Sequence, residues 1–447
     1  MKAYKILYTF LFLVVTMGCE KELEISPTDN LQGEVAFESE ANIASILVGT
    51  YDEAGQAASL GGSLQMFVDL IGATNEVNWN GSFLAPRQAF TKEILIDNGF
   101  VEGIWRNLYE VINQSNLVID NLNIVTSSED EKNRIEGEAR FLRSLSYFDL
   151  IRNFAVPYQN GQTNSQRGVP LRTEGIVDYS VNIAIAPSSA EEVYDLIISD
   201  AMRAYDILPD SNSFFADKYA AQALLARVYF QQGNYAAARD AANDVLRNSG
   251  HQLASTYAGA FNNDSDSVED IFSFQVTSQT GTNQLVIFYA SEDDGGRGGD
   301  ITITDEYLNL FDDANDVRGS FVYINPVNGR QLTQKYRNQF ANITVFRIAE
   351  MHLIRLESNF REGTSLGQDP LAEINALRAR SNAVPLVGPL TSDLIFRERQ
   401  LELAFEGFIL NDVKRTQGMV GTIPFDDESI ILPIPQAERD TNPLINQ

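Results

Sequence analysis

One helical hairpin near the middle of the chain limits the possible folds more than any other stretch. Residues 216–248 read ADKYAAQALLARVYFQQGNYAAARDAANDVLRN. Apolar residues recur at helical spacing through Leu225 and Tyr229, and this pattern stops at Gly233. It restarts at Ala238, a small residue that lets two helices approach closely, as in tetratricopeptide repeats of about 34 residues. Because such a hairpin does not bury its apolar face alone, other helices must stack on it.

Helical periodicity also appears on both sides of the hairpin. Either Ser188 or Ser189 is expected to cap a helix that runs to about Leu208. Other helices are expected at residues 42–56, 101–123, 131–154, 345–360, 370–381 and 393–408. The sequence therefore predicts a mainly α protein with tetratricopeptide-like hairpins that form a superhelical scaffold.

A region without helical periodicity separates the hairpin from the later helices. Between 250 and 342, the apolar runs IFSFQV, QLVIFYA, ITITDEYL and SFVYI alternate with stretches rich in Ser, Asp and Gly. This pattern predicts an insertion of loops and short strands at about 250–342. The tetratricopeptide-like helices then occupy about 101–249 and 343–415.

The N-terminal sequence is typical of an export signal. Two lysines precede a mostly apolar run at residues 6–17, shorter than the roughly 20 residues that a membrane-spanning helix needs. A glycine then stands before the only cysteine, Cys19, and this arrangement resembles a bacterial lipobox. We expect a signal peptide at 1–18, lipidation of Cys19, a tether at 20–41 and the folded domain at 42–447. The alternative is that Cys19 is an incidental or buried thiol.

The net charge restricts the possible partners. Acidic residues outnumber basic residues 61 to 33, which gives a formal charge of -28. A field of this sign repels phosphate backbones and anionic lipid surfaces. The composition therefore argues against nucleic acid as a partner.

Several further motifs follow one another along the chain. They are GEARFLRSLSYFDLIRNFAVPY (137–158), KYAAQALLARVYFQQGNYAAA (218–238), RIAEMHLIRLESNFREG (347–363), EINALRARSNA (373–383), RERQLELAFEG (397–407) with Asp412, Lys414 and Arg415, and ILPIPQAERDTNPLINQ (431–447). Together with the lipobox, they resemble the SusD/RagB family of Bacteroidetes outer-membrane nutrient-binding lipoproteins. The chain departs from the family pattern at Gly407-Phe408-Ile409, where the arginine of a Gly-His-Arg type continuation is absent.

The resemblance implies a lipoprotein that is anchored in the outer membrane and faces the cell exterior. It would bind an oligosaccharide or polysaccharide and deliver it to a SusC-like TonB-dependent outer-membrane transporter. In such proteins the helical face contacts the transporter, and the face built from loops and short strands holds the sugar. No cofactor and no enzymatic activity are expected. Two alternatives remain: a surface glycoside hydrolase, and a tetratricopeptide-type interaction scaffold that binds no glycan.

Sugar binding needs exposed aromatic rings for stacking, and amides or carboxylates for the hydroxyl groups. Trp79 fits this requirement, because it lies in a loop-rich stretch between Asn78 and Asn80. The alternative is that Trp79 plugs the core beneath a loop. Trp105, in contrast, shares a helical stripe with Leu108 and is expected in the core.

A second candidate site is the Gly-rich segment at 291–300, which follows Tyr289. Arg297 and the carboxylates of this segment would close over a sugar while Tyr289 stacks on it. The alternative is a mobile, solvated tip that binds nothing. No Gly-Lys-Ser/Thr follows, so the glycines do not form a phosphate loop.

The remaining polar clusters favour structural roles. Residues 264–267 and 312–316 offer oxygen ligands for calcium, but they lack the pattern of a full EF-hand loop, so plain acidic turns are the better interpretation. Glu398 and Glu402 lie on adjacent turns of one helix, where such spacing more often forms ion pairs within the helix than a catalytic pair. The two histidines lie far apart. We therefore expect no catalytic residue and no metal site.

Overall fold

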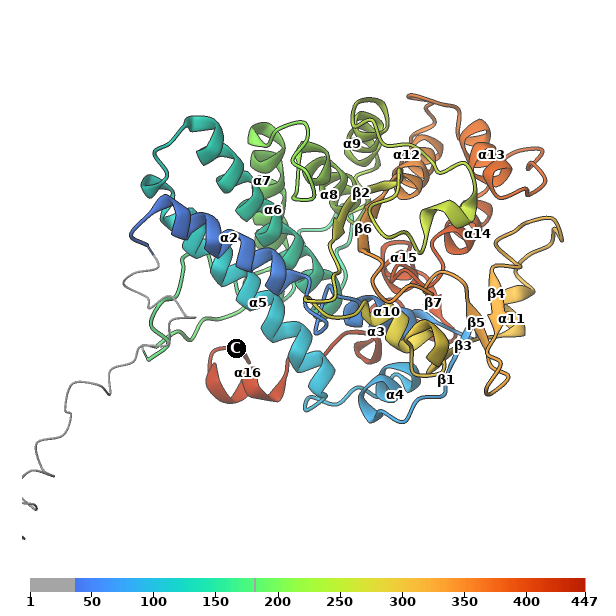
Figure 1. Ribbon diagram of the computed structural model, residues 1–447, viewed down its shortest axis with the longest axis horizontal. Helices are drawn as coiled ribbons and strands as arrows, with labels where there is room; N and C mark the ends of the chain where they lie inside the picture. Colours follow the sequence, from blue (N-terminus) through green and yellow to red (C-terminus); the bar gives the residue numbers. More distant parts are fainter. Residues whose placement is uncertain (1–36, 181, 447) are drawn as a thin grey trace, which may run out of the picture.

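A computed structural model describes residues 37–180 and 182–446 (Figure 1). The predicted signal peptide, Cys19 and most of the predicted tether lie outside the described residues. The described part is mainly helical with short strands, as predicted. Its first helices are α2 (Glu40–Ala54), α3 (Ser63–Gly72), α4 (Leu84–Thr91), α5 (Gly99–Asp120), α6 (Glu129–Phe154), α7 (Ala190–Ile207), α8 (Lys218–Gln231) and α9 (Tyr235–Asn248). No helix in these ranges is both long enough and apolar enough to cross a membrane.

The later helices follow the irregular insertion or lie within it. They are α10 (Gln284–Tyr289), α11 (Asp305–Leu308), α12 (Ile348–Glu362), α13 (Pro370–Arg380), α14 (Ser392–Glu402), α15 (Ile409–Arg415) and α16 (Gln436–Thr441). The helices from α5 to α9 pack in chain order: α5 on α6, α6 on α7, α7 on α8, and α8 on α9. Helix α12 packs on both α9 and α13. Figure 1 shows α7, α8, α9, α12 and α13 following one another across the top of the view. The prediction of a scaffold of stacked hairpins is confirmed.

Local sequence signals set the ends of these helices. The side chain of Ser189 accepts a hydrogen bond from the backbone of Glu192 and forms a capping box with it, so the predicted start of α7 is confirmed. In the hairpin, α8 packs on α9, and both helices carry fully buried alanines such as Ala226 and Ala242. Their small side chains allow the close approach that the sequence predicted.

The strands form four separate antiparallel pairs. They are β1 (Val77–Trp79) with β3 (Ile301–Ile303), β2 (Asp270–Phe274) with β6 (Ile343–Arg347), β4 (Val322–Ile324) with β5 (Gln331–Thr333), and β7 (Met419–Val420) with β8 (Ile423–Pro424). The pair of β2 and β6 lies against the helical body, because both strands contact α8. The predicted insertion of loops and short strands is therefore joined to the helices through its own strands.

Two predicted elements differ from the structure. The run QLVIFYA was expected as a strand, but it forms α10, because Asn283 caps the first turn and a helical turn buries Leu285, Val286 and Phe288 together. The helix expected at 345–360 begins only at Ile348. The residues before it are extended and pair with β2. This pairing gives their backbone N–H groups partners, whereas the first N–H groups of a helix have none within the helix.

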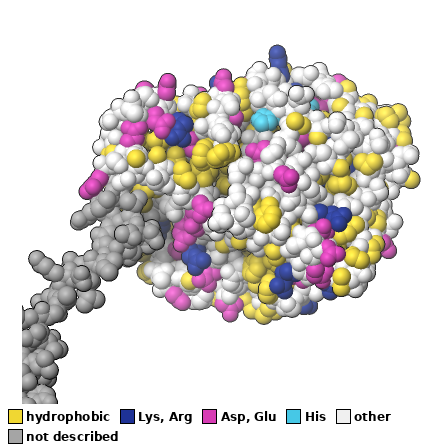
Figure 2. All heavy atoms as spheres, viewed as in Figure 1, with side chains coloured by type: hydrophobic (Ala, Val, Ile, Leu, Met, Phe, Trp, Pro, Cys, Tyr) yellow, Lys and Arg dark blue, Asp and Glu magenta, His cyan; other side chains and the backbone are white. Residues whose placement is uncertain are grey.

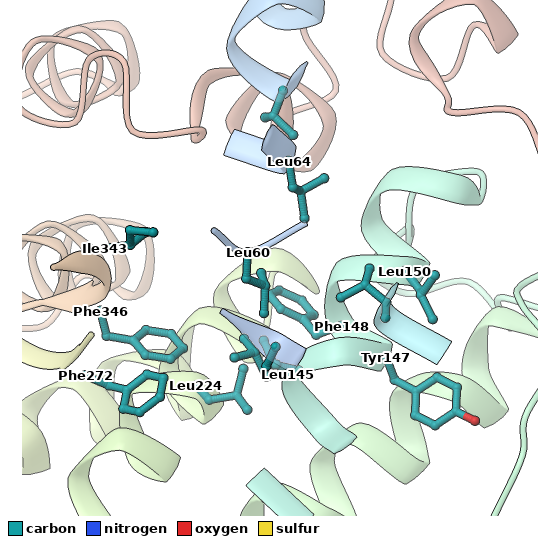
Figure 3. Close-up of a cluster of buried hydrophobic side chains, with 14 of the residues drawn as sticks. Leu60, Leu64, Leu145, Tyr147, Phe148, Leu150, Leu224, Phe272, Ile343 and Phe346 are labelled. Carbon is teal, nitrogen blue, oxygen red and sulfur yellow. The ribbon is translucent and has the colours of Figure 1, made fainter. Parts of the chain in front are cut away.

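The hydrophobic core runs through both the helical body and the insertion (Figure 3). The labelled side chains are Leu60, Leu64, Leu145, Tyr147, Phe148, Leu150, Leu224, Phe272, Ile343 and Phe346, all of them buried. Trp105 is also in the core, where its ring packs on Tyr109 and Phe154 at centroid distances of 4.8 and 5.0 Å. The prediction for Trp105 is confirmed. The shared core indicates that the insertion does not fold as an independent unit.

A buried cluster of ion pairs joins the insertion to α13 and α14. Arg347 donates to Glu402 at 2.9 Å and to Glu269 at 3.1 Å. Arg380 also pairs with both of these carboxylates, and Arg318 lies 3.5 Å from Glu402. Burial alone would raise the pKa of Glu402, but the positive charges of the arginines outweigh burial and hold this pKa well below its ordinary value.

The ion pairs of α14 differ from the prediction in the location of their partners. Glu398 pairs with Arg378 at 2.8 Å, and Arg399 pairs with Asp412 at 2.8 Å. These partners, like those of Glu402, belong to other elements and not to the same helix. The carboxylates of α14 thus hold elements together across the fold.

Candidate functional site

The loop-built face of the molecule centres on the short pair of β1 and β3. Asn78 is exposed and lies opposite Thr302, while its neighbours in β1 point inward. The side-chain amide of Asn80 donates to the hydroxyl of Thr302 at 2.8 Å, and the backbone N–H of Asn80 donates to the carbonyl of Asp300 at 2.6 Å. Two of the predicted amide side chains therefore lie on one exposed surface, with Asn80 held in place by the neighbouring strand.

Trp79 lies beneath this surface. Its side chain is only 6% exposed, since successive residues of a strand face opposite sides and Trp79 shares the inward side with Val77. The ring packs on Phe288 at 6.2 Å, and a side chain at Gly81 would collide with it. The expectation of an exposed tryptophan face is wrong. The indole N–H of Trp79 has no hydrogen-bond acceptor in the structure, which is rare for a buried polar group.

Arg297 is the predicted residue that the structure places most clearly at this surface. Its guanidinium lies 4.3 Å from the centre of the Phe83 ring, and its Nε donates to Asp300 at 2.9 Å. The side chain of Arg297 is more than one-third exposed, and Phe83 is 41% exposed. The arginine is therefore held over an aromatic ring while part of it stays accessible to a ligand.

Backbone hydrogen bonds hold the segment 291–300 against the body of the protein. The backbone N–H groups of Arg297 and Gly299 donate to the carbonyls of Ile287 and Ala290 at 3.0 and 2.8 Å. Gly298, Gly299 and Asp300 are buried. Both sequence hypotheses assumed a mobile tip, and these contacts contradict that assumption. Any ligand on this face meets a preformed surface.

Tyr289 is fully buried and does not reach the loop-built face. Its ring packs on Tyr336 at 5.4 Å and on Phe405 at 6.0 Å. Its hydroxyl donates to Asp69 Oδ2 at 2.9 Å, and burial raises the pKa of this hydroxyl well above its ordinary value. The expected stacking of Tyr289 on a sugar is therefore wrong, because α10 turns this ring into the core.

The burial of Asp69 predicts a pH effect on stability. Burial raises the pKa of Asp69 to about 7, although its carboxylate also accepts from the backbone N–H of Gly407. Because this folded pKa is above the ordinary value of 3.8, the contribution of Asp69 to stability is full below about pH 4 and is lost as the pH rises through about 7. Asparagine does not titrate. Asp69→Asn is therefore expected to raise the melting temperature at pH 8 more than at pH 5.

The measurement is the difference in melting temperature between Asp69→Asn and the wild type across pH 5 to 8. Asp240→Asn, at a side chain that is exposed, serves as the control for the change in net charge. A difference for Asp69→Asn that stays constant over this range would contradict the prediction.

The two acidic segments considered for calcium use their oxygens within the protein. Asp266 accepts from Gln275 at 3.1 Å and from Asn342 at 2.7 Å. Asp316 pairs with the buried Arg318 at 2.6 Å. Within residues 37–180 and 182–446 there is no group of three or more His, Cys, Asp or Glu that could hold a metal ion.

Sequence reasoning missed two features of the surface. Phe83, the ring under Arg297, stands in an irregular stretch without any periodic signal. A cleft of about 430 Å³ also lies between α2, β2 and the loop at residues 214–215. Its walls come from distant parts of the chain, so only the folded structure brings them together.

Comparisons with known proteins identify the family. A model described as "Starch-binding associating with outer membrane" matches residues 22–230, and a model described as "SusD family" matches residues 319–426. SusD-like protein P2 of Formosa agariphila is 25% identical to this chain over 100% of its length and 99% of the relative. The crystal structure of a SusD superfamily protein from Bacteroides thetaiotaomicron is also 25% identical, with a TM-score of 0.81 over 91% of this chain and 99% of that one.

A laminarin-binding SusD-like protein shares the fold at 20% identity, with a TM-score of 0.75 over 91% of this chain and 98% of that chain. These likenesses and the helical scaffold agree with the motifs in the sequence. The chain belongs to the SusD/RagB family of outer-membrane-associated proteins. The description of the first family model names starch binding and association with the outer membrane.

Proposed function

We propose that this protein binds an oligosaccharide or polysaccharide at the cell surface and delivers it to a SusC-like TonB-dependent transporter. Lipidated Cys19 anchors it in the outer membrane, with the folded domain outside the cell. Family membership supports the ligand class, and the export signal supports the location. The stacked hairpins offer the transporter a broad helical face, which leaves the loop-built face for the sugar.

One observation carries the assignment of the sugar to the loop-built face. Arg297 lies on the exposed ring of Phe83, and Asp300 accepts hydrogen bonds both from Arg297 and from the backbone N–H of Asn80. A guanidinium donates two parallel hydrogen bonds to neighbouring sugar hydroxyls, and an amide both donates and accepts. The exposed part of the Phe83 ring can pack on C–H groups of a sugar.

The protein is proposed to bind its glycan without cleaving it. A glycosidase needs two carboxyl groups that face each other across the scissile bond. Glu398 and Glu402, the pair considered for this role, are buried and neutralised by arginines. Reducing ends released from a bound polysaccharide by the purified protein would overturn this part of the proposal.

Replacing Arg297 by alanine is expected to weaken glycan binding by about tenfold or more, because hydrogen bonds to charged groups contribute about 1.5–3 kcal/mol. Asn80→Ala is expected to weaken binding less, since it removes a neutral group. The measurement is calorimetry on the lipid-free protein, with laminarin and other neutral oligosaccharides as probes. Arg106→Ala is the matched control, because Arg106 is exposed on α5. Equal affinities for Arg297→Ala and Arg106→Ala would reject the assignment.

A further inference from the structure

The cleft between α2 and β2 is separate from the loop-built face. One wall is the C-terminal half of α2, and the other is β2 with the segment at 280–284 that leads into α10. The loop at residues 214–215 closes one end. None of the residues Asn78, Asn80, Phe83 and Arg297 lines the cleft. The cleft therefore has a set of lining residues of its own.

The side chains of the cleft suit an uncharged polar ligand. Among the residues that the structure describes, Asp52 is the only charged one that lines the cleft, although the chain as a whole carries a formal charge of -28. Its other polar lining side chains are mostly amides and aliphatic hydroxyls, together with the phenol of Tyr51. These amides and hydroxyls belong to Gln56, Gln275, Gln284, Ser273, Thr280 and Thr282. Neutral groups that both donate and accept hydrogen bonds match sugar hydroxyls better than they match an ion.

An exposed aromatic ring stands at the edge of the cleft. Phe214 is 51% exposed and rests on Phe215, with the ring centroids 4.7 Å apart. Phe215 in turn packs on Tyr51 of α2 at 4.9 Å. Phe214 is therefore supported from below while one part of its ring stays open. On the face shown in Figure 2, hydrophobic side chains gather in small groups among polar ones.

The hydroxyl of Ser273 is an independent indication that the cleft binds a ligand. It lies on β2, lines the cleft and is only 3% exposed. Its hydroxyl oxygen has no hydrogen-bond partner in the structure. A buried hydroxyl without a partner costs free energy, and most such groups in folded proteins are paired. A ligand hydroxyl in the cleft would pair it.

We propose that this cleft is a second carbohydrate site, which takes a neutral sugar ring against Phe214 and a sugar hydroxyl on Ser273 Oγ. Gln56 of one wall and Thr282 of the other offer further polar groups for the remaining hydroxyls. The ligand class rests on the proposed function, but the site itself rests on the lining residues, the open ring and the unpaired hydroxyl. The protein would then hold one glycan chain at two points, or two chains at once.

The test uses a panel of neutral oligosaccharides, with laminarihexaose, cellohexaose, xylohexaose and mannohexaose as probes. Calorimetry on the lipid-free wild type is expected to show two sites. Phe214→Ala is expected to weaken one of them by about tenfold and to leave the other unchanged. Arg297→Ala is expected to have the opposite selectivity. Phe340→Ala, at another exposed phenylalanine that lines neither site, is the control.

Ser273→Ala separates a role in binding from a role in folding. Because the hydroxyl has no partner in the free protein, its removal is expected to leave the melting temperature unchanged or higher. The same change is expected to weaken the cleft site by about fivefold. A structural hydroxyl would show the reverse, a lower melting temperature with unchanged binding.

The outcomes distinguish the two proposals. A single site that Arg297→Ala removes and Phe214→Ala leaves intact would overturn the second site and support the loop-built face. A site that only Phe214→Ala and Ser273→Ala weaken would support the cleft and overturn the assignment of Arg297. No binding of any probe in the panel would overturn both.

Discussion

Replacing Arg347 by methionine is expected to lower the free energy of unfolding by about 3–5 kcal/mol, as measured for other buried ion pairs that lose one partner. Arg347 is buried and donates to Glu402 at 2.9 Å, to Glu406 at 2.7 Å and to Glu269 at 3.1 Å. Methionine keeps much of the volume but leaves these carboxylates without part of their neutralising charge. Urea denaturation, monitored by circular dichroism, measures the loss.

The control for this prediction is Arg203→Met. Arg203 pairs with Glu136 at 3.1 Å, but nearly half of its side chain is exposed to solvent. Exposed pairs contribute about 1 kcal/mol or less, because water screens both charges. Losses of equal size for Arg347→Met and Arg203→Met would show that the buried cluster is not a main source of stability.

Replacing Phe272 by alanine is expected to lower the free energy of unfolding by about 3–5 kcal/mol, the usual cost of truncating a buried aromatic residue. The Phe272 ring meets Phe141 of α6 at 5.0 Å and Phe274 at 5.2 Å, both edge to face. It stands where β2 of the insertion packs on the helical body (Figure 3). Thermal and urea unfolding measure the effect.

The same variant tests whether the insertion and the helices unfold together. With one core through both parts, Phe272→Ala is expected to shift a single transition to a lower temperature. Phe340→Ala, at an exposed ring, is expected to cost less than 1 kcal/mol. A split into two transitions, or a loss no larger than that of Phe340→Ala, would contradict the shared core.

The helical part of the fold could be predicted because its signals are local. In α7 to α9, the apolar period of 3.6 residues and the capping side chains of Ser189, Asp217 and Asn234 act within one or two turns. The pairing of the strands has no comparable local signal in the sequence. β1 and β3 each have three residues, and the contact of Asn80 with Thr302 spans 222 residues of sequence. A pairing over that distance depends on the whole fold.

The candidate site could be predicted by region but not by side-chain orientation. The composition around Trp79 indicated a loop-rich stretch with amides, and Asn78 and Asn80 are exposed there, yet a three-residue strand is too short to show which side faces inward. The same limit applies to Tyr289, whose helical turn was expected as a strand. The cleft beside Ser273 could not be predicted, because its walls come from four separate parts of the chain.

The buried ion pairs also constrain the order in which parts of the fold can form during synthesis. Glu269 and its partner Arg380 are separated by 111 residues of sequence. Chains emerge from the ribosome at about 5–20 residues per second, with the N-terminal part first. For several seconds, therefore, the acidic residue and the apolar strand after it exist without the arginines that later surround them. The insertion therefore cannot complete this ion-pair cluster before α13 and α14 have been made.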